Sequence, residues 1–143
     1  MEDLIYNLDN YDYEIINNNL IIKTKEYEIS KEDLLNTDLN NSTIKNFIEN
    51  NEIFPLSYKE VLRRLLIKFS AKKLKEISIF KLLIKDGEIK KNGYFYLEKI
   101  NISYRGLCNN DCIKEIINLI EYLDIKFEIK IKLSNGKIII YKK

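Results

Sequence analysis

The 143-residue sequence contains no histidine and no tryptophan, one proline, four glycines and two cysteines. Without histidine the chain cannot build a Ser-His-Asp or Cys-His catalytic group, an HExxH zinc site or a histidine general base near neutral pH. The glycines stand in neither a GxGxxG nor a GxxxxGK arrangement, so the two common phosphate-binding loops are missing. We therefore expect a protein without catalytic activity, cofactor or metal site.

Long apolar runs and a secretory signal are also missing. No apolar run approaches the roughly 18 residues that a transmembrane helix needs, and the N-terminus carries acids where a secretory signal carries bases. Two cysteines are too few for a disulfide scaffold in a chain of this length. The sequence therefore predicts a cytoplasmic protein with reduced thiols and no membrane contact.

The composition indicates a folded chain. Hydrophobic residues make up 45% and charged residues 32%, far from the low hydrophobicity and high net charge of disordered proteins. With no internal repeat and no low-complexity linker, we predict one domain over residues 1–143, of the α+β class. Its parts should be a small mixed or antiparallel sheet, an N-terminal β-hairpin, central helices and a C-terminal β-α-β-β unit.

The net charge of +2 conceals an uneven distribution. Residues 1–56 carry 12 acidic and 4 basic side chains, a net of −8, whereas residues 57–143 carry 10 acidic and 20 basic ones, a net of +10. Such asymmetry can mean a nucleic-acid-binding surface on the basic part. Equally, it can mean two parts that neutralise each other within one fold. The place where the acidic third docks decides between these alternatives.

Local signals in the first half predict strands, then helices. Tyr11–Ile16 and Leu20–Thr24 are rich in Ile and Tyr and flank three asparagines, which tight hairpin turns accept. Capping residues and apolar spacing further predict a strand over 26–29, a helix over 31–36 and a helix from Ser42 or Thr43 to about Asn50.

The helix start at Ser57 is the clearest in the chain, because Glu60 stands three residues later in a capping box. If this helix ran straight on, Lys73 would fall inside its apolar arc, which predicts a kink or a stop near Ser70. The span 77–84, ISIFKLLI, fits a buried strand or a buried helix equally well.

The last third carries the best-defined pattern. We predict a strand over Tyr94–Tyr104, then a helix with isoleucines and a leucine repeating at helical spacing over 113–123. Strict alternation of apolar and charged residues predicts a half-buried strand over Ile125–Leu133, and a turn at 134–136 leads to a final strand over Lys137–Tyr141. The crossover should be right-handed if its first two strands are parallel neighbours.

The segment Val61–Lys75, VLRRLLIKFSAKKLK, holds six lysines and arginines among eight apolar residues and no acid. Its cations are candidate contacts to nucleic acid or to a partner protein: Arg63, Arg64, Lys68, Lys72 and Lys75. If carboxylates of residues 1–56 lie opposite three of these cations, Arg64, Lys68 and Lys75, nucleic-acid binding is weak. If the cations are bare, affinity falls steeply with salt. The opposite charges of the two parts favour the first alternative.

Three tyrosines in the predicted strand 94–104 are candidate contact aromatics: Tyr94, Tyr96 and Tyr104. Rings on one face of a sheet can stack on bases beside lysines, as in RNA-binding sheets. Tyrosine is also a good strand former with an apolar body, so packing within the sheet or a protein interface is the favoured alternative.

The stretch Cys108–Cys112, CNNDC, stands at a strand-to-helix junction, where the helix N-terminus can lower the pKa of a thiol. Zinc would need two further ligands, and the redox motif has two intervening residues rather than three. We therefore expect Cys108 to pack as a small apolar residue, with one of residues 109–111 capping the helix.

The sequence thus favours a small intracellular binding or inhibitor protein that acts by contact with another protein. Immunity proteins of toxins and phage-encoded blockers of host defence are proteins of this kind. A nucleic-acid-binding accessory protein that uses the basic helix around Arg63–Lys75 is the alternative. Both hypotheses follow from size, missing catalytic groups and surface composition rather than from a family motif.

Overall fold

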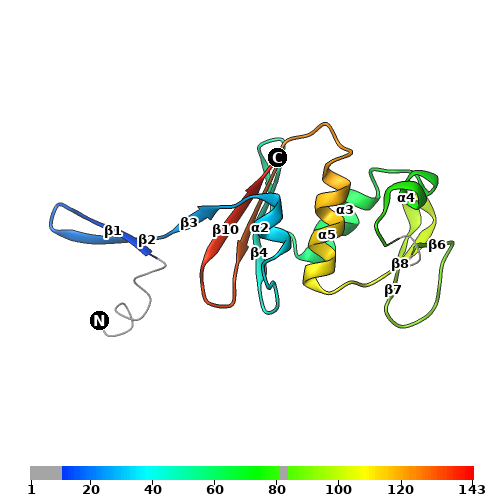
Figure 1. Cartoon of the computed structure of the whole chain (residues 1–143), viewed down its shortest axis with the longest axis horizontal. Coiled ribbons are helices and arrows are strands. Elements are labelled where there is room, and N and C mark those ends of the chain that lie inside the picture. The colour runs from blue at the N-terminus through cyan, green and yellow to red at the C-terminus, as the bar shows by residue number, and fades with distance from the viewer. Residues whose placement is uncertain (1–10, 81–83) are drawn as a thin grey trace.

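The computed structural model describes residues 11–80 and 84–143. These residues form four α-helices and ten β-strands in three sheets, so the predicted α+β class is confirmed. Figure 1 shows the parts along the long axis of the molecule: a two-stranded hairpin, a five-stranded sheet, a group of helices and a three-stranded sheet. No helix within the described residues is long and apolar enough to cross a membrane.

The N-terminal hairpin consists of β1 (Tyr11–Ile16) and β2 (Asn19–Thr24), paired antiparallel. Asn17 and Asn18 form its turn with φ of 51° and 67°, the left-handed conformation that a two-residue hairpin turn of type I′ requires. The predicted hairpin is therefore confirmed, with a loop shorter by one residue because Asn19 already pairs with Ile16.

The five-stranded sheet joins strands of the acidic third to the C-terminal strands. Its order is β3-β10-β9-β4-β5, with β3 parallel to β10 and the other pairs antiparallel. Its strands are β3 (Glu26–Glu28), β4 (Thr43–Glu49), β5 (Glu52–Phe54), β9 (Phe127–Lys132) and β10 (Ile138–Lys142). The predicted C-terminal hairpin β9–β10 thus lies between N-terminal strands, and the acidic third docks on the basic part by strand pairing.

The predicted helix over 42–50 is wrong, because this segment is the strand β4. Ile44 and Phe47 stand three residues apart, a spacing typical of a helix face. A register irregularity between Ile44 and Asn46 nevertheless brings both onto one sheet face, opposite Ile131 and Ile129. Single-sequence periodicity does not reveal such a bulge.

Helices α2 (Lys31–Leu35) and α3 (Tyr58–Leu66) begin at the predicted serine N-caps. In α3 the capping box is complete: the Glu60 amide donates to Ser57 Oγ at 3.3 Å, and the Ser57 amide donates to Glu60 Oε1 at 3.2 Å. The predicted stop is confirmed, since α3 ends at Leu66 and α4 (Ala71–Ile77) begins with Ser70 as a new N-cap.

The three-stranded sheet, in the order β6-β8-β7, corrects the prediction of one strand over 94–104. Its strands are β6 (Ile84–Asp86), β7 (Tyr94–Leu97) and β8 (Ile102–Arg105). A 3₁₀ turn, η3 (Glu98–Ile100), and Asn101 at φ 49° reverse the chain between β7 and β8. In the ambiguous span 77–84, Ile77 is the last residue of α4 and Ile84 is the first residue of β6, while residues 81–83 lie outside the described part.

Helix α5 (Asn109–Ile120) links the two larger sheets and carries the predicted apolar stripe. β8 before it and β9 after it lie in different sheets, so the condition for a right-handed crossover is not met. In Figure 1, α3 and α5 stand between the five-stranded and three-stranded sheets. One core cluster joins α3, α5 and both sheets, and its fully buried members include Phe47, Leu65, Ile102, Ile116 and Ile129.

The capping box of α3 gives a direct stability test. Ser57→Ala should lower the free energy of unfolding by about 1 kcal/mol, because the Glu60 amide loses its acceptor. Urea unfolding followed by circular dichroism measures this change. The matched Ser134→Ala substitution in the exposed β9–β10 turn should stay within about 0.5 kcal/mol of wild type. Equal effects of the two substitutions would contradict a capping role for Ser57.

Candidate functional site

The basic face of α3 meets the acidic third at one carboxylate, Glu49 at the end of β4. Arg64 Nη2 donates to Glu49 Oε2 at 2.7 Å, and Lys68 Nζ lies 3.1 Å from Glu49 Oε1. The Arg64 guanidinium also lies over the Phe54 ring, 3.8 Å from its centroid. Glu49 is only 8% exposed, so both cations are engaged at a nearly buried contact.

The charge of Glu49 is stabilised by these partners. Burial alone would raise the pKa of this carboxyl, but the hydrogen bond from Arg64 and the contact with Lys68 outweigh burial and hold the pKa below its usual value. Glu49 Oε1 and Arg64 Nε are buried without a hydrogen-bond partner among the described residues. The contact between Lys68 and Oε1 is therefore an electrostatic attraction without hydrogen-bond geometry.

The remaining cations of the basic segment are placed differently. Lys75 Nζ lies 2.6 Å from Asp86 Oδ1, so its partner is a β6 residue of the basic part and not a carboxylate of the acidic third. The expectation for Lys75 is thus corrected, whereas Arg64 and Lys68 do face the acidic third. Arg63 and Lys72 are exposed and form no ion pair with a described residue.

Further ion pairs join the acidic third to the C-terminal hairpin. Glu26 on β3 lies 3.1 Å from Lys130, and Glu28 lies 3.8 Å from Lys142. Both pairs are partly exposed, so each contributes little stability on its own. Together with Glu49, these pairs neutralise part of the negative charge of the acidic third within the fold, at the five-stranded sheet and at α3.

Glu49→Gln should lower the free energy of unfolding near pH 7 by about 1 to 3 kcal/mol, because Arg64 and Lys68 lose their shared carboxylate. Folding lowers the pKa of Glu49, so its stabilisation is fully present above the unfolded-state value of about 4.3. It is lost as the pH falls through the lower folded-state value. Urea unfolding at several pH values should show the two proteins converging in acid.

The control for this measurement is Glu88→Gln, which changes an exposed glutamate outside the Glu49 contact. It should stay within about 0.5 kcal/mol of wild type at neutral pH. A stability gap between wild type and Glu49→Gln that persists unchanged in acid would contradict the assigned role of Glu49.

The three candidate tyrosines do not form one surface. Tyr94 and Tyr96 lie on β7 and share one sheet face, where both are half-buried. Tyr104 lies on β8, pairs with Phe95 and points to the core side, and burial raises its pKa. Its ring centroid is 5.6 Å from that of Phe95, a tilted aromatic pair. The expectation that all three belong to one strand was wrong because the chain reverses at η3.

The expectation that Cys108 packs as a small apolar residue is wrong. Cys108 is exposed at the N-cap position of α5 and makes no side-chain capping bond, whereas Cys112 is the buried one. Its thiol donates to the Tyr58 carbonyl at 3.4 Å, and burial raises its pKa to about 12. Asn109 and Asn110, proposed as caps, instead hydrogen-bond to the backbone at Leu39 and Thr37, fixing α5 to the segment before β4.

Thiol titration tests the exposure of Cys108 and the burial of Cys112. One thiol should react with a disulfide reagent at about pH 8 in the native protein, because only Cys108 is exposed and Cys112 stays protonated. In denaturant both should react. Cys108→Ser should remove the native reaction and leave the fold intact, whereas rapid native reaction of that variant would contradict the burial of Cys112.

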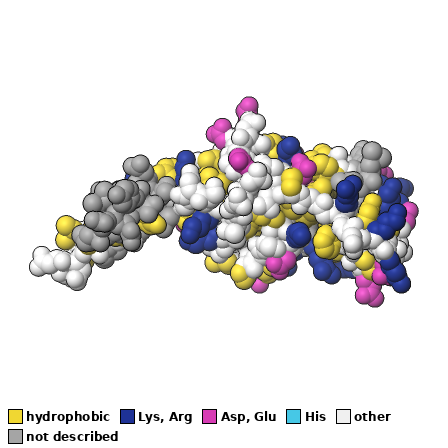
Figure 2. Space-filling view, turned by 90° about the horizontal axis from the view of Figure 1, so that it is seen from below, with side chains coloured by type: hydrophobic (Ala, Val, Ile, Leu, Met, Phe, Trp, Pro, Cys, Tyr) yellow, Lys and Arg dark blue, Asp and Glu magenta, His cyan; other side chains and the backbone are white. Residues whose placement is uncertain are grey.

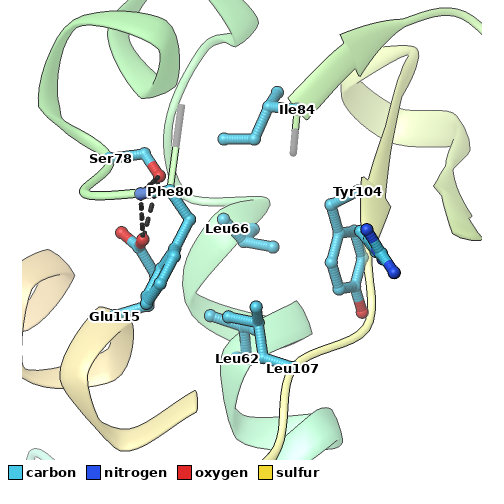
Figure 3. A pocket seen from close by; sticks show the side chains of 9 residues that line it. Leu62, Leu66, Ser78, Phe80, Ile84, Tyr104, Leu107 and Glu115 are labelled. Carbon is cyan, nitrogen blue, oxygen red and sulfur yellow. Dashed lines mark hydrogen bonds between the residues drawn. The ribbon is translucent and has the colours of Figure 1, made fainter. Parts of the chain in front are cut away.

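A small pocket lies between the helices and the three-stranded sheet (Figure 3). Its walls are largely apolar, with Leu62, Leu66 and Tyr104 facing the hollow, and Glu115 stands at one side. The Glu115 carboxylate accepts from Ser78 Oγ at 2.9 Å and from the Phe80 amide at 3.3 Å. The hollow of about 20 Å³ has room for one water molecule, far below a typical ligand site. Glu115 therefore anchors the turn after α4.

A second hollow also lacks convergent chemistry. An open hollow of about 370 Å³ lies beside the start of β4, but the Ser42 and Tyr58 hydroxyls on its wall bond to each other at 2.7 Å. Across the described residues, no group of three or more Asp, Glu, Cys or His side chains is placed to hold a metal ion.

The feature that sequence reasoning missed is the exposure of the hairpin β1–β2. Ile15 is 75% exposed and Leu20 51%, and the two stand directly opposite each other across the hairpin. Ile22 shares their face, since it follows Leu20 by two residues on the same strand. No local signal reveals that the described core leaves this face uncovered.

Comparison of this chain with protein-family models, with curated proteins and with solved structures found no match. The functional interpretation therefore depends on the geometry of the chain itself.

Proposed function

We propose that this protein binds a partner protein through the β1–β2 hairpin and acts by contact rather than by catalysis. The observation that carries the proposal is the apolar face of Ile15, Leu20 and Ile22, exposed on an arm that projects from the body of the molecule (Figure 1). Exposed apolar groups that share one face are typical of protein interaction sites, whereas scattered single ones need no explanation.

The physical state of the arm supports this proposal. A hairpin of two strands is marginally stable in water unless a further layer covers its apolar face. Of the eight large hydrophobic side chains that are exposed among the described residues, four lie in this hairpin: Ile15, Ile16, Leu20 and Ile22. Burying such a face stabilises by about 25 cal/mol per Å² of apolar area removed from water.

The shape of the arm defines the partner that it fits. Its paired strands end in the narrow turn at Asn17 and Asn18, so the tip and one face can enter an apolar cleft on another protein. A protein that fills such a cleft can block it, which is the contact mode of the binding or inhibitor class favoured by the sequence. The absence of histidine and of phosphate-binding loops in the sequence is consistent with a role without turnover.

The alternative function, nucleic-acid binding by the basic helix, receives less support. Two of its central cations, Arg64 and Lys68, already share Glu49, and Lys75 lies against Asp86. A phosphate would have to compete with these carboxylates. We therefore expect the segment 61–75 to bind nucleic acid weakly.

The proposal is tested by Ile15→Ser combined with Leu20→Ser. Wild type, immobilised and exposed to an extract of its native host, should retain a partner protein, and the double variant should retain it at least about tenfold less well. A photo-crosslinking side chain introduced at Ile15 should become attached to that same partner. Circular dichroism verifies that the body of the variant remains folded.

The matched control is Ile53→Ser combined with Ile79→Ser, which removes two isoleucines that are 60% and 53% exposed away from the arm. This control should retain the partner as wild type does. Equal loss in both double variants, crosslinks from Ile15 only to a second copy of this chain, or measurable turnover by purified wild type would overturn the proposal.

A further inference from the structure

Positive charge gathers at the end of the molecule opposite the hairpin. Figure 2 shows Lys and Arg side chains over the end that α4 and the three-stranded sheet form. Between residues 71 and 105 the described part of the chain carries eight basic and four acidic side chains. Six of the basic ones are exposed without an ion-pair or hydrogen-bond partner among the described residues: Lys72, Lys85, Lys90, Lys91, Lys99 and Arg105.

Of these six cations, only Lys72 belongs to the basic segment Val61–Lys75. Arg64 and Lys68 are engaged by Glu49, and Lys130 by Glu26, so carboxylates of the acidic third reach α3 and the five-stranded sheet. No described residue of the acidic third forms an ion pair with the six cations at the far end. The docking of the acidic third therefore leaves an uncompensated basic surface there.

Two aromatic rings lie on the outer face of the small sheet among these cations. Strand pairing places Tyr94 directly opposite Arg105, and places Tyr96 and Lys85 on either side of Ser103. These side chains share one sheet face because paired residues point to the same side, whereas Tyr104 points to the core. Tyr96 is further positioned by its hydroxyl, which donates to Asn101 Oδ1 at 2.7 Å.

A loop is fixed across the same face. Ser103 is fully buried, and its hydroxyl donates to the Gly87 carbonyl at 2.7 Å and accepts from the Ile89 amide at 2.9 Å. The loop after β6 is thus bound to the middle of the outer face, and Lys90 and Lys91 follow immediately. Strand pairing and hydrogen bonds therefore fix the backbone positions of the residues that carry these rings and cations.

We propose that this outer face binds single-stranded nucleic acid through Tyr94, Tyr96, Lys85 and Arg105, which lie around Ser103 and the loop bound to it. A single strand offers both phosphates for the cations and unstacked bases for the rings. A duplex hides its bases from such rings, and an acidic protein surface offers carboxylates to the cations but no unstacked bases to the rings. The face is separate from the hairpin, so the proposal does not depend on the proposed protein partner.

The test is fluorescence anisotropy with labelled oligouridylate and oligothymidylate, measured from about 50 to 200 mM salt. Wild type should bind, and log affinity should fall with log salt by about 0.7 for each phosphate neutralised. Lys85→Glu combined with Arg105→Glu should abolish most binding and flatten this slope. Comparison of the two oligonucleotides shows whether RNA or DNA is preferred.

The tyrosines supply the distinguishing measurement. Tyr94→Leu combined with Tyr96→Leu should weaken binding by about tenfold or more without changing the salt slope, because stacking is lost while the charges remain. The matched charge control is Lys45→Glu combined with Lys132→Glu, which reverses two exposed lysines on the five-stranded sheet. This control should bind nearly as wild type does.

Several results would overturn the proposal. Absence of binding at the lowest salt, or equal weakening by the two charge-reversal pairs, would show that no defined surface exists at this end. Unchanged affinity of the leucine double variant, or a duplex of equal length bound as tightly, would reduce the face to a general polyanion surface. Displacement of the oligonucleotide by polyglutamate at equal charge would point to an acidic protein instead.

Discussion

The structure depends on strand pairing between segments that are about a hundred residues apart in the chain. β3 pairs with β10 and β4 with β9, so the C-terminal hairpin is completed into a five-stranded sheet by the acidic third. This pairing covers the edges of a hairpin that would be marginal alone. It also carries Phe47 into the core, where its ring stacks on Phe127 with centroids 5.7 Å apart. The core between the helices and this sheet exists only once the pairing has formed.

The same strand pairing decides which basic side chains are neutralised by carboxylates of the acidic third and which remain unpaired. β4 delivers Glu49 to Arg64 and Lys68, and β3 delivers Glu26 and Glu28 to the C-terminal hairpin. The three-stranded sheet lies beyond the helices and receives no ion pair from a described residue of the acidic third. At the opposite end, the β1–β2 hairpin precedes the sheet without being covered by it (Figure 1). The molecule thereby acquires an apolar arm at one end and a basic face at the other.

Most features that depend on neighbouring residues were predicted correctly, and most that depend on residues distant in the chain were not. The Ser57 capping box, the asparagine turn of β1–β2 and the stripe of α5 were predictable, because each depends on residues within a few positions of one another. The strand β4 was mistaken for a helix, since a bulge placed Ile44 and Phe47 on one face. Of the candidate site, the contacts of Arg64 and Lys68 with the acidic third were expected. The partner of Lys75 and the orientation of Tyr104 were not, because both depend on which strands become neighbours.

The sequence by itself determined the N-cap of α3 and the turn of the β1–β2 hairpin. It also determined that histidine-dependent chemistry is missing and that two oppositely charged parts share one chain. Only the tertiary structure decided which cations pair with Glu49, which tyrosines face outward and that Ile15 and Leu20 remain exposed. The physical reason is that burial and charge pairing are properties of neighbours in space. A strand has the same alternation of apolar and polar residues whether its apolar face is buried in the core or exposed to water. The elements that pack against that face decide whether it is buried.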